Sequence, residues 1–153
     1  MAWTRITSAT TTFLNNKASI SLATTFSVQA GDVLIAVFGA SDIVPTGIAI
    51  SDGTNTWVQI DKKGISNGWV FPLVVVNSAA LTNPTFVATN SAGGNIAGWG
   101  QLSVHQFRPP TGSTVSLDGT PVGTGVNAAS AATPPAWSIW PWVTSIFASV
   151  SFS

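Results

Sequence analysis

Apolar residues along this 153-residue chain recur mainly at every second position, which is the spacing of β-strands. Ile20 and Leu22 alternate with serines, and the alternation resumes at Phe26 and Val28, which predicts one half-buried strand. Residues 33–40, VLIAVFGA, are apolar throughout and have the length of a central strand buried on both faces. Further strands are predicted at residues 48–50, 56–61, 68–76, 82–89, 97–107 and 114–117. No segment has a convincing helical period.

Turn-forming residues separate these strands. SDGTNTW, residues 51–57, has the strongest turn signal because Asp-Gly and Asn tolerate positive φ, so we expect a β-hairpin there. Pro72 lies inside the strand 68–76 and predicts an edge position or a bulge, since proline cannot donate to a ladder. About eight or nine strands with no crossover helix predict an antiparallel β-sandwich of jelly-roll-like or immunoglobulin-like kind.

The chain divides into three regions by composition. The length suits one domain, or one domain with an arm, and we place the sandwich at residues 1–118. Residues 119–133, GTPVGTGVNAASAAT, are small and uncharged, which is typical of a flexible linker or a long loop. Residues 134–153 are rich in tryptophan and uncharged, and they form a C-terminal strand or an assembly arm.

Charged residues are scarce. They make up 7% of the chain, against about 25% in an ordinary soluble domain, and five cations balance five aspartates. Without a basic surface, nucleic acid is not an expected partner. A surface so poor in charge suits contact with other protein subunits; the alternative is a secreted domain rich in Ser, Thr and Asn. The start of the chain has no apolar run after Arg5, which predicts no signal peptide.

Few residues could carry chemistry. The chain has no cysteine, which excludes disulfides and thiolate chemistry. Four aspartates, at positions 32, 42, 52 and 118, adjoin Gly or Ser and are expected to form turns, with a two-carboxylate glycosidase and a calcium loop at SDGTN as alternatives. His105 has no second histidine beside it for a metal, and no G-x-S-x-G motif occurs. We therefore expect a non-enzymatic protein without cofactor or metal.

Three tryptophans of the sandwich have two interpretations. Trp57, Trp69 and Trp99 could stack on pyranose rings if one face presented them, as in a carbohydrate-binding module. Alternatively each fills the core or a contact between subunits, because aromatic side chains dominate both kinds of packing.

The aromatic C-terminal stretch has three interpretations. A transmembrane helix needs about 20 mainly apolar residues, and Pro141 interrupts this stretch. A final strand of the sandwich is indicated by FASVSFS, residues 147–153, where apolar residues alternate with serine. In the third interpretation an arm adds to a neighbouring subunit, with aromatic anchors at its interface. Those anchors would be Trp137, Trp140, Trp142, Phe147 and Phe152.

Several stretches together resemble a β-sandwich module of phage virion structural proteins and bacterial surface proteins. The resemblance covers about residues 18 to 120 and implies the fold and a structural or adhesive role, with no catalytic residues. It rests on AGDVLIAV (30–37), SDGTNTWVQI (51–60), GWVFPLVVV (68–76), NPTFVAT (83–89) and GQLSVHQFR (100–108).

From these observations we expect a non-enzymatic virion structural protein, most simply a tailed-phage capsid decoration (cement) protein. It would be made in the host cytoplasm and located on the capsid surface. Its partners would be copies of itself, with trimers a natural expectation at local three-fold positions, and the major capsid protein, with no nucleic acid and no membrane. The alternatives are a head or tail fibre component and a carbohydrate-binding module with a glycan ligand.

Overall fold

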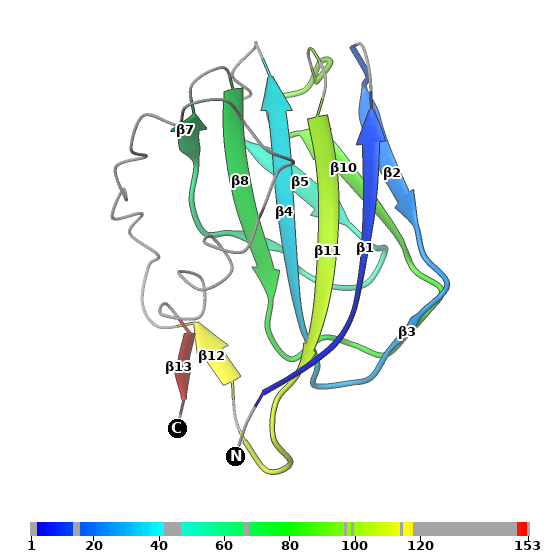
Figure 1. Ribbon diagram of the computed structural model, residues 1–153, viewed down its shortest axis with the longest axis vertical. Helices are drawn as coiled ribbons and strands as arrows, with labels where there is room; N and C mark the ends of the chain where they lie inside the picture. The colour runs from blue at the N-terminus through cyan, green and yellow to red at the C-terminus, as the bar shows by residue number, and fades with distance from the viewer. Residues whose placement is uncertain are drawn as a thin grey trace, which may run out of the picture.

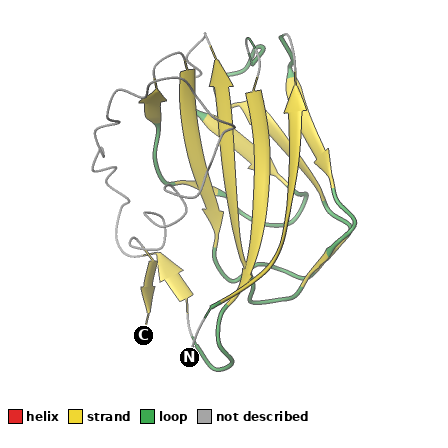
Figure 2. Ribbon diagram, viewed as in Figure 1, coloured by secondary structure: helices red, strands yellow, loops and turns green. Residues whose placement is uncertain are grey.

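The computed structural model describes residues 3–13, 16–41, 47–65, 68–96, 98, 100–113, 115–117 and 150–152. In this part of the chain all regular structure is β-strand, and the strands pair antiparallel, so the predicted all-β class is confirmed (Figures 1 and 2). The strands are β1 (Thr4–Phe13), β2 (Ser19–Ala23), β3 (Ser27–Val28), β4 (Val33–Ser41), β5 (Ile48–Ser51), β6 (Val58–Gln59), β7 (Lys63–Ile65), β8 (Gly68–Val75), β9 (Leu81–Thr82), β10 (Thr85–Asn90), β11 (Gly100–Arg108), β12 (Val115–Leu117) and β13 (Val150–Phe152).

Two sheets form the body of the molecule. A six-stranded sheet has the order β1-β11-β4-β8-β6, with β7 also paired to β8, and a three-stranded sheet has the order β2-β10-β5. The smaller sheet lies behind the larger one in Figure 1, and apolar residues of both sheets belong to one buried cluster. This face-to-face packing makes the fold an antiparallel β-sandwich. Two short pairs, β3–β9 and β12–β13, lie outside the two main sheets.

The main core follows from strand alternation. In β2, Ile20 and Leu22 point inward and are buried, while Ser19 and Ser21 are exposed. In the centre of the core, the fully buried rings of Phe38 on β4 and Phe71 on β8 lie 6.3 Å apart between centroids. Phe86 of β10, also fully buried, faces them from the smaller sheet.

The six-stranded sheet is apolar on its second face as well. The prediction that residues 33–40 are buried on both sides is confirmed, because Val33, Ile35 and Val37 are at most 5% exposed although they point away from the main core. A second buried cluster forms on this face, with part of it contributed by β12. Its members are Val33, Ile35, Ile60, Val74, Phe107 and Val115, with Trp3, Val76 and Leu117 packed against them.

The prediction of a β-hairpin at residues 51–57 is wrong. A turn does form there, but β5 before it pairs with β10 in the small sheet, while β6 after it pairs with β8 in the large sheet. The chain therefore crosses from one sheet to the other at this turn. Trp57 packs against the core between them, and an amide-to-side-chain hydrogen bond from Ile48 to Gln59, 2.8 Å, links the two strands in place of a ladder.

Pro72 lies in β8 between two partners rather than at a free edge. On one side β8 pairs with β4 along its whole length, and on the other side it pairs with β6 and then with β7. The carbonyl of Pro72 accepts a hydrogen bond from the Ile60 amide, 3.0 Å, so the proline nitrogen points to the same side. That side is where β6 has ended and β7 has not begun, so the missing N–H costs no ladder bond.

The N-terminal and second strands differ from expectation. Residues 18–28, predicted as one strand, form β2 and β3, which belong to different sheets. β1 was not predicted, because TRITSATTTF has no apolar alternation, although threonine favours strands. Of the three regions assigned from composition, described strands β1 to β12 lie within 1–118, and residues 119–133 fall outside the described residues.

Candidate assembly surface

The tryptophans considered for sugar stacking occupy packed positions where they are described. The Trp57 ring meets Phe86 edge-on, with 5.9 Å between centroids, and its Nε1 donates to Asp52, 3.1 Å away. The Trp69 ring is half-buried against the main core, and the Nζ of Lys62 lies 4.6 Å from its centroid. Trp99 lies outside the described residues.

The predicted tail anchors lie almost wholly outside the described part of the chain. These are Trp137, Trp140, Trp142 and Phe147. Phe152 lies in β13, whose backbone pairs with β12 of the same chain, Phe152 opposite Val115. The end of the tail thus adds a strand next to the second apolar cluster, to which Val115 belongs.

Asp52 organises the turn between the two sheets. Its Oδ1 accepts hydrogen bonds from the amides of Thr54 and Asn55, at 3.0 and 2.8 Å, and its Oδ2 accepts from the Asn55 and Trp57 side chains. The predicted turn-forming role of this aspartate is therefore confirmed. Burial opposes ionisation, but the hydrogen bonds from Asn55, Thr54 and Trp57 outweigh it and hold the pKa of Asp52 below its usual value.

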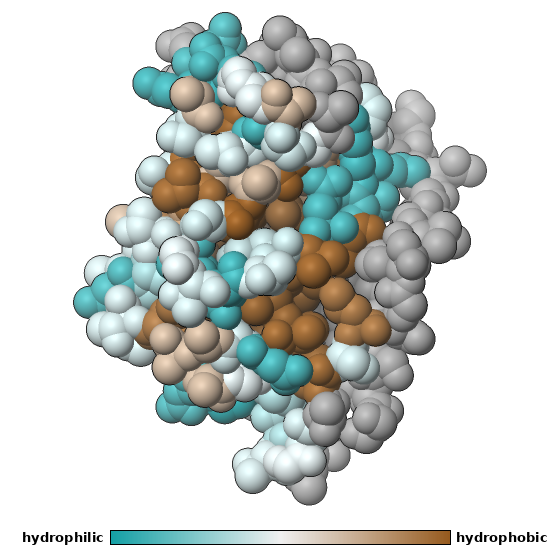
Figure 3. All heavy atoms as spheres, turned by 180° about the vertical axis from the view of Figure 1, so that it is seen from behind, coloured by the Kyte–Doolittle hydropathy of each residue, from teal (hydrophilic) through white to brown (hydrophobic). Residues whose placement is uncertain are grey.

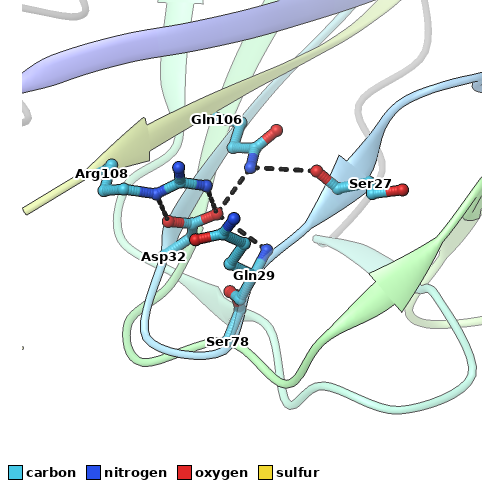
Figure 4. Close-up of polar contacts among 6 residues, drawn as sticks. All are labelled: Ser27, Gln29, Asp32, Ser78, Gln106 and Arg108. Carbon is cyan, nitrogen blue, oxygen red and sulfur yellow. Dashed lines mark hydrogen bonds and ion pairs between the residues drawn. The ribbon is translucent and has the colours of Figure 1, made fainter.

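A second polar cluster, centred on Asp32, joins the turn before β4 to β11 (Figure 4). Asp32 lies in the turn before β4 and is 1% exposed. Its carboxylate accepts from the Gln29 amide, 2.9 Å, and from the Gln106 side chain, 2.6 Å. Arg108 donates to both carboxylate oxygens, Nε to Oδ1 at 2.8 Å and Nη2 to Oδ2 at 3.0 Å. This two-pronged ion pair joins residues that are 76 positions apart in the chain.

The charge of Asp32 is stabilised by these donors. Burial disfavours the carboxylate, but the hydrogen bonds from Arg108, Gln106 and Gln29, with the positive charge of Arg108, hold the pKa of Asp32 below its ordinary value. The aspartate was predicted as a turn residue only. Gln106 and Arg108 were not predicted to take part, because nothing in the local sequence of β11 indicates a partner in the β3–β4 turn.

His105 lies on the second face of the six-stranded sheet. It stands opposite Ser8 of β1 and Ile35 of β4, and it is 7% exposed. Its Nε2 has no hydrogen-bond partner, so the ring behaves as part of the apolar face rather than as a ligand. Burial, together with the charge of Arg5, lowers the pKa of His105, which keeps the imidazole neutral near pH 7.

The surface of the sandwich is uneven in polarity. Seen from behind, apolar residues gather in the middle and toward one side among polar ones (Figure 3). Within the described ranges, two large apolar side chains are more than a third exposed: Ile6 at 40% on β1 and Val58 at 38% on β6. They lie at the two opposite edges of the six-stranded sheet.

These features define an antiparallel β-sandwich whose two main polar clusters hold turns together. Among the residues described, no group of three or more histidines, aspartates or glutamates is placed to hold a metal ion, and no helix is long and apolar enough to cross a membrane. No protein-family model, curated protein or solved structure matches the chain.

Proposed function

We propose that this chain is a non-enzymatic structural protein of a virus particle, a capsid decoration protein that joins neighbouring subunits on the shell. The observation that carries the proposal is the apolar character of the six-stranded sheet, which is buried on its second face and exposes Ile6 and Val58 at its two edges. An antiparallel sandwich usually turns one face of each sheet to water, as the small sheet does with Ser19 and Ser21. The large sheet instead carries Val33, Ile35 and Val37 on that face, where the same chain already buries them, so contact with other subunits would fall on the exposed edges of the sheet.

Two features of the sequence support the same proposal. A charged fraction of 7% is low for a protein that must stay dispersed, whereas surface buried between subunits needs little charge. The resemblance to phage virion modules covers β4, β8 and β11 of the large sheet, but not β1. In this mechanism, apolar surface and the Trp-rich C-terminal stretch are buried between copies of the chain and against the major capsid protein, which cross-links the shell.

The described aspartates fit a structural role. Asp32 and Asp52 each accept several hydrogen bonds from their own chain, and these bonds hold turns. A carboxylate held this way is a poor general base, because its pKa is lowered and its lone pairs are occupied. A head or tail fibre component would use the same surfaces and stays an alternative within the class.

Light scattering coupled to size exclusion tests this proposal. The full chain is compared with a chain that stops at residue 133, which lacks the Trp-rich stretch. We expect a defined oligomer from the full chain and a lower mass from the shorter one, with circular dichroism showing that both are folded. If both chains are folded monomers of equal stability, the proposal that this chain is a capsid decoration protein is wrong. A glycan array with Trp57→Ala and Trp69→Ala variants would then test the carbohydrate-binding module.

A further inference from the structure

The two edges of the six-stranded sheet are built differently. At one edge, β6 has two residues and β7 has three, the chain between them leaves the ladder beside Pro72, and Lys62 and Lys63 lie at the break. Short strands, lysines and interruptions are the devices by which proteins keep sheet edges from pairing with other chains. This edge is protected against pairing.

The opposite edge is β1, and it has few of these protections. It is ten residues long and forms the border of the large sheet in Figure 1. Within the described part of the chain, β1 pairs with β11 alone, and its register is regular from Thr7 to Phe13. The one irregularity lies at Ile6, and the stretch from Ile6 onward contains no charge and no proline. It is a long, neutral edge of the kind that accepts another strand.

The hydrogen-bonding groups on this edge can be assigned. Neighbouring residues of an antiparallel strand turn their N–H and C=O groups to opposite sides. The Ile60–Pro72 hydrogen bond fixes this alternation in β8. The same alternation can be followed through the registers of β8 with β4, β4 with β11 and β11 with β1. It follows that the backbone N–H and C=O groups of Ser8, Thr10 and Thr12 point to the open edge.

We propose that this edge pairs with β1 of a second copy of the chain, antiparallel about a two-fold axis at Thr10, so that two large sheets become one continuous sheet. In this register Thr10 faces Thr10 and Ser8 faces Thr12, and the three pairs exchange about six backbone hydrogen bonds. The backbone of Arg5 lies before the overlap, and its guanidinium donates to the Ser8 hydroxyl at one end of it, so the arginines of the two copies lie at opposite ends and do not meet. The contact is isologous and distinct from the tail contact expected for a trimer.

A second copy fits this edge better than an unrelated peptide. β1 is already extended and held by β11, so pairing costs little of the ordering entropy that a disordered peptide pays. Hydroxyl side chains opposite one another across strands are favourable pairs, and Thr10 and Thr12 are both exposed. The Thr10 hydroxyl is hydrogen-bonded to the Ser103 hydroxyl, 3.0 Å away, and a hydroxyl can form a further bond with its counterpart. The inference rests on the self-assembly proposed above and names the strand that carries one of its contacts.

Cross-linking of a single introduced cysteine tests the axis directly. The chain has no cysteine, so Thr10→Cys provides its sole thiol. Residues facing each other in a hydrogen-bonded antiparallel pair have Cα atoms about 5.5 Å apart, but their Cβ atoms are farther apart than an unstrained disulfide allows. We therefore expect a short bis-maleimide, which spans two facing thiols, to give a covalent dimer of the full chain. The control Thr85→Cys, exposed on β10 of the small sheet, should stay monomeric on a non-reducing gel.

A charge on the axis provides the second test. Thr10→Lys places two ammonium groups opposite one another, and we expect the dissociation constant of the β1-mediated contact to rise by about tenfold or more. Thr85→Lys adds the same charge away from β1 and should leave it unchanged. Thr10→Lys removes the hydroxyl hydrogen bond between Thr10 and Ser103, but it keeps the backbone ladder of β1 with β11 because the Thr10 backbone groups point outward.

The outcomes separate this inference from the proposed function. In one outcome the full chain is an oligomer, but Thr10→Cys cross-links no better than Thr85→Cys and Thr10→Lys leaves the mass unchanged. The proposed β1 contact is then wrong, while the proposed assembly function is retained. If the unmodified chain is a monomer at all concentrations and neither variant differs from it, both proposals are wrong.

Discussion

Replacing Asp32 by Asn should destabilise the sandwich by about 3 kcal/mol at pH 7. The carboxylate of Asp32 is 1% exposed and accepts hydrogen bonds from Gln29, Gln106 and Arg108. Breaking a buried ion pair costs about 3–5 kcal/mol, because it leaves an uncompensated partner. The lower end applies here, since the Arg108 side chain is 35% exposed and its guanidinium can rehydrate when released.

Urea unfolding followed by tryptophan fluorescence measures this loss at pH 7. Asp61→Asn is the matched control, because Asp61 accepts one local amide hydrogen bond from Lys62 that an asparagine oxygen can also accept. We expect that control to stay within about 0.5 kcal/mol of the unmodified protein. A double-mutant cycle of Asp32→Ala and Arg108→Ala should give a coupling energy of about 1–3 kcal/mol, as residues in direct contact do.

The same substitution should flatten the acid limb of the stability curve. The folded-state pKa of Asp32 lies below its ordinary value of 3.8, so the unfolded chain binds a proton first as the pH falls. The stabilisation is complete above about pH 5 and is lost as the pH falls through 3.8 toward the folded-state pKa. Asp52 contributes in the same window in both proteins, so the difference between them reports Asp32. A loss under 1 kcal/mol at pH 7, with an unchanged acid limb, would refute a stabilising role for this ion pair.

Four further changes have defined outcomes. Asp52→Ala should cost about 2 kcal/mol in urea unfolding and shift the emission of Trp57, since the turn loses its acceptor; an unchanged spectrum would contradict this. Gly53→Ala should cost about 1–2 kcal/mol by the same measurement, because Gly53 has a φ of 83°, which strains a residue with a side chain. An added Cβ would meet no atom within 4 Å, so backbone strain is the whole of the expected cost. Phe86→Ala should cost about 4 kcal/mol and lower the melting temperature, and a loss below 2 kcal/mol would mean that the core collapses around it. The unmodified protein should lose stability as the pH falls from 7.5 to 5.5, because the pKa of His105 is lowered in the folded state and the unfolded chain therefore binds the proton first. His105→Leu should remove this loss, and equal pH slopes in both proteins would rule this out.

The strands that the sequence predicted well are those whose burial does not depend on distant partners. Residues 33–40 are apolar enough to be buried in any arrangement, and β4 is the most central strand of the large sheet. β1 was missed because it is an edge strand made of Thr and Ser, so its apolar pattern is weak. Its membership of the sheet depends on the ladder with β11, which is set by residues about 90 positions away.

The turn at Asp52 shows why local signals are ambiguous about topology. Asp-Gly with Asn is correct chemistry for a tight turn, and the turn is present. Whether the strands on its two sides pair depends on β10 and β8, which compete for them, and on Trp57, which packs on Phe86 in the core between the sheets. Likewise, the aspartate of AGD was recognised as a turn residue, but its pairing with Arg108 is long-range and left no local pattern.

The proposed pairing of β1 would account for both the low charge of the chain and the architecture of its large sheet. Several of the described charges have structural tasks: Asp32 pairs with Arg108, Asp52 holds a turn, and Lys62 lies over Trp69. Few charges are then left to keep the sheet edges apart. Lys62 and Lys63 lie at the start of β7, and the charge on β1 is Arg5, which precedes the regular stretch from Thr7 to Phe13. A monomer with that distribution would leave the uncharged stretch of β1 from Ile6 to Phe13 exposed to chance pairing. A protein whose β1 edge meets a defined partner has no need of charge there, because the partner occupies the edge.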